Sequence, residues 1–348
     1  MRNNYRLKKT AKKAIDGGNV EIVYLGGSAT AGYILEKGNI ENNFAKISFD
    51  YFCRKTKNNR CTFSNYAVSG ADAFTGLAIS DKYIKEEPAD VVFIEYALNN
   101  GNDDESILAF ESLVRKIYNM ENKPAIVLVL LANEDFSSSG EYMKTLGEHY
   151  GLPVIDICEI LKTEIESGNV KWNEYSFDSG HPTEYGHEFI ASCINKMWDS
   201  IWKEKFDKEL KEMPTPYFGD RYQEYTFVNF SAFRDMNFSG FRYFTKDEIF
   251  SERISSTGES QSVVSFTARF KSIFLMFEST NNINCGEMHI YIDNNYVENI
   301  SGYSSVGRDD ITSRLVYKDE NEAFHDVKVL MKNKDGKSFI NLIGVGLS

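Results

Sequence analysis

The sequence predicts an α/β domain with a parallel sheet in three layers, followed by an all-β sandwich domain. Between residues 20 and 212, short continuous apolar runs alternate with segments of helical periodicity. Such runs are typical of parallel strands that helices cover on both faces. Beyond residue 220 the pattern changes to short strands with partial alternation, and the stretch 213–220, with two prolines, separates the two patterns. We therefore expect a domain at 1–212, a linker at 213–220 and a second domain at 221–348.

The first domain is expected to hold five parallel strands. One of them precedes Asn65, and the apolar runs that predict the other four are 20–25, 91–94, 125–131 and 153–156. Apolar residues at helical spacing predict a helix over 103–119, and a long closing helix is expected over 183–211. Five strands with interleaved helices are typical of a three-layer, flavodoxin-like α/β domain.

The second domain is expected to be a two-sheet sandwich of the jelly-roll type. Its predicted strands are 263–270, 273–277, 288–292, 296–297, 327–331 and 339–343. The residues Asp293–Asn295 predict a turn, and Asn333–Gly336 is a signal for a hairpin between the last two strands.

Composition narrows the choice of partners and compartment. The chain has 348 residues and a formal charge of −12, which argues against nucleic acid or an anionic membrane as a partner. No run approaches the roughly 20 apolar residues that a membrane span needs, and no apolar segment follows the basic N-terminus. We expect a cytoplasmic protein, or a secreted one if a leader has been removed. The five cysteines form no CxxC pair, which favours reduced thiols.

The glycine-rich turn after the first strand presents a serine, Ser28, within Gly-Gly-Ser-Ala-Thr. A P-loop is excluded because Tyr33 and Ile34 stand where that motif needs Lys and Ser or Thr. The pattern is close to the GxSxG turn that exposes a nucleophilic hydroxyl. The alternative is that Ser28 only caps the following helix.

Other loops of the same domain carry polar residues suited to hydrolysis. Gly70 follows the second strand and Asn99 the third, while Asp178 and His181 come late in the domain. Loops at the carboxyl ends of parallel strands emerge at one edge of a sheet, so these residues can converge. A hydroxyl, an imidazole and a carboxylate are the three parts of a hydrolytic triad.

In these four blocks the sequence resembles the SGNH, or GDSL-like, hydrolase family over about residues 20–200. The matching positions are Ser28, Gly70 in Val-Ser-Gly-Ala, Asn99 in Glu-Tyr-Ala-Leu-Asn-Asn, and Asp178 with His181 in Asp-x-x-His-Pro. Two departures are visible: the family's Gly-Asp-Ser is Gly-Gly-Ser here, and its Gly-x-Asn-Asp is Ala-Leu-Asn-Asn. Neither departure replaces a residue that performs chemistry.

The resemblance implies a serine esterase in which Ser28 is the nucleophile, His181 the base and Asp178 its partner. The backbone N–H groups of Ser28 and Gly70, with the Asn99 amide, would form an oxyanion hole, and no metal or organic cofactor is required. A jelly-roll domain beside such a fold is similar to certain carbohydrate esterases, although there the sandwich precedes the catalytic domain. We therefore expect short acyl esters, above all O-acetyl groups on an oligosaccharide or another small molecule, as substrates.

Two other functions stay open at this point. The same triad serves a carbohydrate O-acyltransferase, in which a sugar hydroxyl replaces water. The second alternative is a carbohydrate-binding protein whose triad no longer catalyses a reaction.

His187 is six residues after His181, a poor spacing for two metal ligands on one helix, so a structural histidine is favoured. Glu95, at the end of an apolar strand, is interpreted as a hydrogen-bonded carboxylate behind the site.

Overall fold

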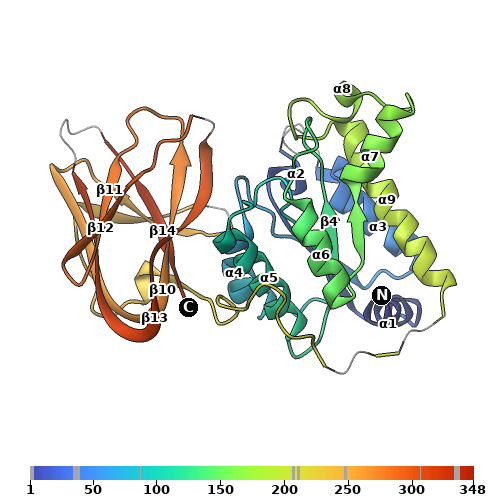
Figure 1. Ribbon diagram of the computed structural model, residues 1–348, viewed down its shortest axis with the longest axis horizontal. Coiled ribbons are helices and arrows are strands. Elements are labelled where there is room, and N and C mark those ends of the chain that lie inside the picture. Colours follow the sequence, from blue (N-terminus) through green and yellow to red (C-terminus); the bar gives the residue numbers. More distant parts are fainter. Residues whose placement is uncertain are drawn as a thin grey trace. The chain divides into compact units, whose positions relative to one another are not determined.

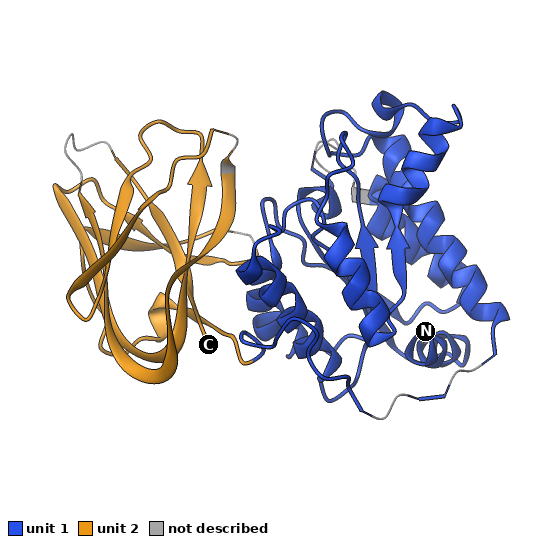
Figure 2. Ribbon diagram, in the orientation of Figure 1, with its two compact units in different colours: residues 1–223 blue, residues 224–348 orange. Residues whose placement is uncertain are grey.

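The computed structural model describes residues 4–33, 40–86, 88–205, 208–209, 212–246, 249–305, 307–332 and 338–348 (Figure 1). The chain divides into two compact units, residues 1–223 and 224–348 (Figure 2). The first unit is α/β and the second is all-β, as the sequence predicts. No helix among the described residues is long and apolar enough to cross a membrane.

The first unit is built on a five-stranded parallel sheet with the order β2-β1-β3-β4-β5. Its strands are β1 (Val20–Gly26), β2 (Cys61–Asn65), β3 (Val91–Glu95), β4 (Ala125–Leu130) and β5 (Val154–Asp156). This is the strand order of flavodoxin-like domains, so the predicted fold class is confirmed. Every residue of β3 and β4 is buried, which explains why both strands are continuous apolar runs.

Helices cover both faces of this sheet (Figure 1). Helices α1, α3 and α9 contact one another, and α5 contacts both α4 and α6. The helices are α1 (Tyr5–Ile15), α2 (Ser28–Ala31), α3 (Phe44–Thr56), α4 (Ala73–Ile79), α5 (Asp104–Tyr118), α6 (Gly140–Tyr150), α7 (Ile157–Glu166), α8 (Trp172–Tyr175) and α9 (Glu184–Lys203), with 3₁₀ and π segments at Ile40–Asn42 and Ser80–Ile84. The predicted three layers are therefore present.

Helix α9 is shorter than the sequence predicts. It begins after Thr183, whose hydroxyl accepts a hydrogen bond from the N–H of Gly186, but it ends at Lys203 rather than at residue 211. Glu204 already has extended backbone angles, with φ −73° and ψ 157°. The charged run Lys-Glu-Lys at 203–205 gives the helix no apolar side chain to bury there, which is the physical reason for the earlier end. Of the predicted remainder, residues 206–207 and 210–211 lie outside the described part of the chain.

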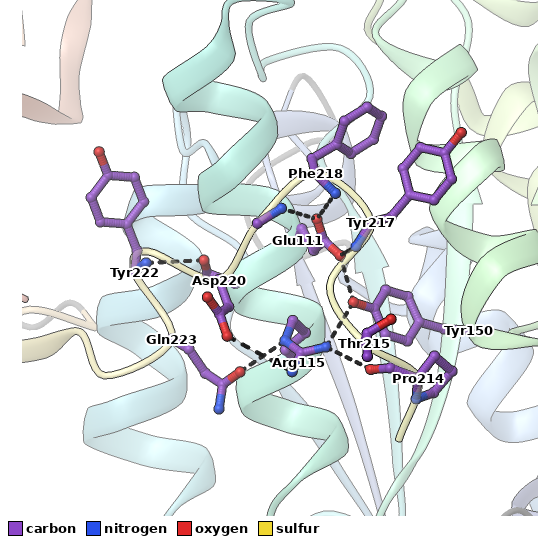
Figure 3. A network of polar contacts seen from close by, with 12 residues as sticks. Glu111, Arg115, Tyr150, Pro214, Thr215, Tyr217, Phe218, Asp220, Tyr222 and Gln223 are labelled. Atoms are coloured by element: carbon purple, nitrogen blue, oxygen red, sulfur yellow. Dashed lines mark hydrogen bonds and ion pairs between the residues drawn. The ribbon is translucent and has the colours of Figure 1, made fainter. Parts of the chain in front are cut away.

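The segment that contains the predicted linker is bound to helix α5 within the first unit (Figure 3). Glu111 is fully buried, and its carboxyl oxygens accept hydrogen bonds from the backbone N–H groups of Tyr217, Phe218 and Gly219 at 2.6, 2.6 and 2.8 Å. One turn later on the same helix, Arg115 donates to the carbonyl oxygen of Pro214 at 2.9 Å. The contacts bind an irregular segment to a regular helix, and the division between the units falls after it, at Gln223.

The Glu111 contacts predict a stability effect. Glu111→Gln replaces one acceptor oxygen with an NH₂ group that faces backbone donors, so buried N–H groups lose their partner. We expect a loss of about 2–4 kcal/mol in the free energy of unfolding of the first unit, measured by chemical denaturation. A variant as stable as the natural protein would show that the segment gains nothing from this carboxyl group.

The second unit is a nine-stranded antiparallel sheet around an apolar core. The strand order is β12-β11-β13-β10-β14-β9-β8, with β6 on β14 and β7 on β10. The strands are β6 (Thr226–Asn229), β7 (Asn237–Ser239), β8 (Phe241–Thr245), β9 (Glu252–Ser256), β10 (Gln261–Thr280), β11 (Glu287–Ile292), β12 (Asn295–Ser301), β13 (Arg308–Lys332) and β14 (Asn341–Leu347), with a 3₁₀ turn at Phe230–Ala232. Between β11 and β12, Asp293 and Asn294 have φ of 52° and 64°, which confirms the predicted turn.

Two details of the predicted second unit are wrong. The segments 263–270 and 273–277 belong to a single strand, β10, whose pairing with β13 shifts register at Phe270/Ser272 and again at Ile273/Phe274. The predicted hairpin between 327–331 and 339–343 does not form, because β13 and β14 both pair with β10 and not with each other. Its turn, Asn333–Gly336, lies outside the described residues. Alternation within a strand specifies which face is buried but not which strand is the neighbour.

Candidate active site

Ser28 lies at the first position of the short helix α2, directly after β1. Gly27 before it is extended, and Gly32 after the helix has φ 82°, a left-handed conformation that glycine adopts without a steric penalty. The strand therefore ends in a tight turn that leaves the Ser28 side chain half-exposed at the carboxyl edge of the sheet. This is the placement that the glycine-rich pattern predicts.

Three of the predicted site residues form a continuous hydrogen-bonded chain. The Ser28 Oγ lies 2.9 Å from His181 Nε2, although 153 residues separate them in the sequence. On the other side of the ring, His181 Nδ1 lies 2.8 Å from Asp178 Oδ2. The imidazole can therefore accept a proton from the hydroxyl on one side while the carboxylate holds the N–H of its other nitrogen.

The loop that carries Asp178 and His181 is folded back on itself. The backbone N–H of Phe177 and the hydroxyl of Ser176 both donate to the carbonyl oxygen of His181, at 3.0 and 2.8 Å. The indole N–H of Trp172, from α8, donates to the carbonyl oxygen of Asp178 at 2.9 Å. These contacts fix the backbone at both residues. Trp172 is a supporting residue that the sequence did not identify, since an indole before a loop is compatible with simple packing.

Asp178 is held in its charged form by the same loop. Its Oδ1 accepts the backbone N–H groups of Gly180 and His181, at 2.9 and 2.8 Å. Partial burial raises the pKa of Asp178, but these two hydrogen bonds, with the imidazole contact, outweigh that effect and lower the pKa below its ordinary value. An ionised carboxylate therefore faces His181 Nδ1 at neutral pH.

Gly70 and Asn99 lie on two neighbouring turns. The N–H of Val68 donates to the carbonyl oxygen of Gly26, which joins the turn that contains Gly70 to the end of β1, and Gly70 itself has φ 72°. The carboxamide of Asn99 packs on Gly27 so closely that a Cβ at position 27 would lie 2.3 Å from Asn99 Oδ1. A larger residue before Ser28 would thus displace the Asn99 carboxamide, an effect that the sequence pattern did not indicate.

Comparison with known proteins gives matches by structure alone. No family model matches the sequence, and no curated protein matches it. A two-domain esterase (CEX) active on acetylated mannans, co-crystallised with mannopentaose, matches with a TM-score of 0.89 and 20% identity over 100% of this chain and 95% of that one. A second structure of such an esterase matches with a TM-score of 0.89 and 21% identity, over 99% and 95% of the two chains.

The chain has the fold of this two-domain esterase. The match extends over both units, so the β unit is part of the shared architecture. The architecture that the sequence resemblance implied, a three-layer α/β domain with an appended β domain, is confirmed.

The remaining histidine of the region, His187, lies in the core of this fold. It is fully buried on α9, where its Nδ1 accepts the N–H of Phe44 at 3.2 Å and its ring stacks on the Phe44 ring. Burial lowers the pKa of His187 to about 4. Among the described residues, no group of three or more His, Cys, Asp and Glu side chains is arranged to hold a metal ion. His187 is therefore a neutral core residue.

The lowered pKa of His187 predicts a loss of stability in acid. An unfolded histidine has a pKa of about 6.5, so between pH 6.5 and 4 the unfolded chain binds a proton that the folded chain does not. The contribution of His187 to the free energy of unfolding therefore falls as the pH falls through that range. His187→Asn keeps an acceptor for the N–H of Phe44. Between pH 7 and pH 4.5 we expect the free energy of unfolding of this variant, measured by chemical denaturation, to fall by about 2–3 kcal/mol less than that of the natural protein.

The value at pH 7 is the control for this measurement, since there the exchange changes packing alone. An equal loss in both proteins between the two pH values would show that His187 does not titrate on unfolding.

Proposed function

We propose that the protein is a serine esterase that hydrolyses short acyl esters, with O-acetylated carbohydrate as the preferred substrate class. The observation that carries the proposal is the hydrogen-bonded chain from Ser28 Oγ through His181 to Asp178. Its geometry matches the nucleophile, base and orienting carboxylate of hydrolytic triads, which are recognised by geometry and roles. Ser28 is also only partly buried.

In the proposed mechanism, Ser28 Oγ attacks the carbonyl carbon of the ester as its proton passes to His181 Nε2. The C–O bond to the alcohol breaks, and the imidazolium returns the proton to the departing oxygen. A water molecule then gives a proton to His181 Nε2 and attacks the acyl carbon. The bond from that carbon to Ser28 Oγ breaks as the imidazolium returns the proton to Oγ, which releases the acid and restores Ser28. Asp178 holds His181 in the tautomer with hydrogen on Nδ1 and stabilises the imidazolium that forms.

The negative oxygen of each tetrahedral intermediate needs hydrogen-bond donors close to Ser28. We assign this role to the backbone N–H groups of Ser28 and Gly70 and to the Asn99 carboxamide. Support comes from the contact of Asn99 with Gly27 and from the backbone hydrogen bond that joins the Gly70 turn to β1. Donors held by the backbone before the reaction begins need no reorganisation as charge develops.

The substrate class follows from three kinds of support. The four sequence blocks resemble those of SGNH hydrolases, and the whole chain shares its fold with an esterase active on acetylated mannans. The net charge of −12 makes neutral glycans more suitable substrates than anionic polymers. An acetyl group on a sugar hydroxyl is a short acyl ester, which needs no apolar channel for a fatty chain.

Replacement of the proposed nucleophile tests this function. We expect Ser28→Ala to lower the kcat for 4-nitrophenyl acetate and for acetylated manno-oligosaccharides by at least about 10³-fold, because the hydroxyl that forms the acyl-enzyme is lost. Ser179→Ala, which removes a hydroxyl from the loop of Asp178 and His181, serves as the control and should retain activity. Hydrolysis that continues unchanged in Ser28→Ala would contradict the proposal.

The same assays separate the alternative functions. Release of acetate into water identifies a hydrolase, whereas transfer of acetyl to an added oligosaccharide would identify an acyltransferase. Binding of glycans without turnover of any ester would indicate a binding protein.

The contact between Asn99 and Gly27 predicts a second activity effect. We expect Asn99→Ala to lower kcat about 10²–10³-fold with KM little changed, since a donor to the transition state is lost. Gly27→Ala should lower kcat in the same direction, because the new Cβ would displace the Asn99 carboxamide.

The double variant shows whether both substitutions act through one contact. If they do, Gly27→Ala has little further effect in the Asn99→Ala background, and the two single effects are not additive. Additive losses would show that Gly27 acts independently of Asn99.

A further inference from the structure

Glu95 is a carboxyl group in a place that an apolar residue would normally occupy. It is the last residue of β3, the central strand of the sheet, and only 2% of its surface is exposed. Burial of a carboxyl group is unfavourable unless hydrogen bonds replace its lost hydration. The contacts of Glu95 therefore indicate what the residue does.

The first contact is with the turn that carries Ser28. The hydroxyl of Thr30, two residues after Ser28, donates to Glu95 Oε2 at 2.9 Å, and both groups are buried. In the sheet, Glu95 is paired directly with Gly26. A Cβ at position 26 would lie 2.2 Å from Thr30 Oγ1 and 2.9 Å from the carbonyl oxygen of Glu95, so glycine at this position permits the approach.

The short helix after Ser28 depends on such contacts. Helix α2 has only four residues, too few to be stable through its own hydrogen bonds. In addition to the Glu95 contact, the carbonyl oxygen of Thr30 accepts the side-chain amides of Asn43 and Asn65, each at 2.9 Å. Thr30 is thus held by side chains from three separate segments, and Ser28 lies within the turn that it anchors.

The second connection runs through the chain itself, because the turn that carries Asn99 follows Glu95 directly. The backbone N–H groups of Asn99 and Asn100 donate to the carbonyl oxygen of Tyr96, the residue after Glu95, at 3.2 and 2.9 Å. The hydrogen bond from Thr30 to Glu95 therefore joins the turn of Ser28 to the start of the turn of Asn99. Burial raises the pKa of Glu95 to about 7, while the Thr30 hydroxyl and nearby backbone N–H groups act in the opposite direction.

We propose that Glu95 is a positioning residue that sets the spacing between Ser28 and the Asn99 amide. The inference rests on the proposed function for its kinetic consequence, but its structural content stands by itself. Glu95 touches neither the ester nor His181 in this role: its side chain holds Thr30 in the turn of Ser28, and the turn of Asn99 begins directly after it. An error of about 1 Å in the placement of such groups is enough to cost roughly 10²-fold in rate.

The kinetic experiment uses paired variants. Glu95→Gln puts an NH₂ group among donors, and we expect kcat to fall about 10–100-fold with KM within about 2-fold. Thr30→Val, of the same shape without the hydroxyl, should lower kcat about 10-fold, whereas Thr30→Ser should restore it to near the natural value. The loss in the Glu95→Gln, Thr30→Val double variant should be smaller than the product of the single losses.

Glu111→Gln is the matched control, because Glu111 is another buried glutamate of the same unit and its carboxyl oxygens accept backbone N–H groups away from the proposed site. It should lower stability without changing kcat. If Glu95→Gln likewise lowers only stability, or if Thr30→Ser is as impaired as Thr30→Val, Glu95 is a structural residue and the inference is overturned.

Crystal structures of the natural protein and of Glu95→Gln test the inference without reference to activity. We expect the distance from Ser28 Oγ to Asn99 Nδ2 to change by about 1 Å, in keeping with the rate loss. An unchanged distance overturns the inference even if the protein is an active esterase. A changed distance in a protein that hydrolyses no ester supports the positioning role and refutes the proposed function alone.

Discussion

The site depends on the parallel direction of the strands around β1. Because β1 pairs in parallel with β2 on one side and β3 on the other, the turns after all three strands emerge at the same edge of the sheet. Those turns carry Ser28, Gly70 and Asn99. The pairing of Gly26 with Glu95 and the hydrogen bond from Val68 to Gly26 then connect the three turns to each other. A strand of opposite direction would carry its turn to the far edge of the sheet.

His181 and Asp178 reach this edge in a different way. No strand delivers them, since α7 and α8 lie between β5 and their loop. The loop instead depends on local hydrogen bonds to the carbonyl oxygen of His181 and on the indole of Trp172. The contact between Ser28 and His181 therefore joins an element whose position the sheet determines to one whose position depends on side chains.

Three buried polar side chains of the first unit, Glu95, Glu111 and His187, each have a hydrogen-bond partner, but the consequence differs among them. Glu111 accepts backbone N–H groups of an irregular segment, and Glu95 accepts the hydroxyl of Thr30, so each holds a turn or an extended segment against a regular element. His187 keeps its proton-accepting nitrogen paired and stays neutral, which makes it part of the core. Position alone separates a carboxylate that lies beside the proposed site from one that anchors the segment after α9.

Apolar runs and periodicity along the sequence were sufficient to predict four of the five parallel strands, the helix over α5 and the α/β and all-β halves, because burial of one face or both repeats along each element. The glycine turn and the Asp-x-x-His segment, read with the family resemblance, predicted that Ser28, His181 and Asp178 come together, and the structure places these side chains in contact. Tertiary packing decided where α9 ends, that β10 is continuous, and which strands pair with β13 and β14. Likewise, Thr30, Trp172 and the glycine before Ser28 acquire their roles only from neighbours distant in sequence, because a hydrogen bond or a close approach exists only once both partners are in place.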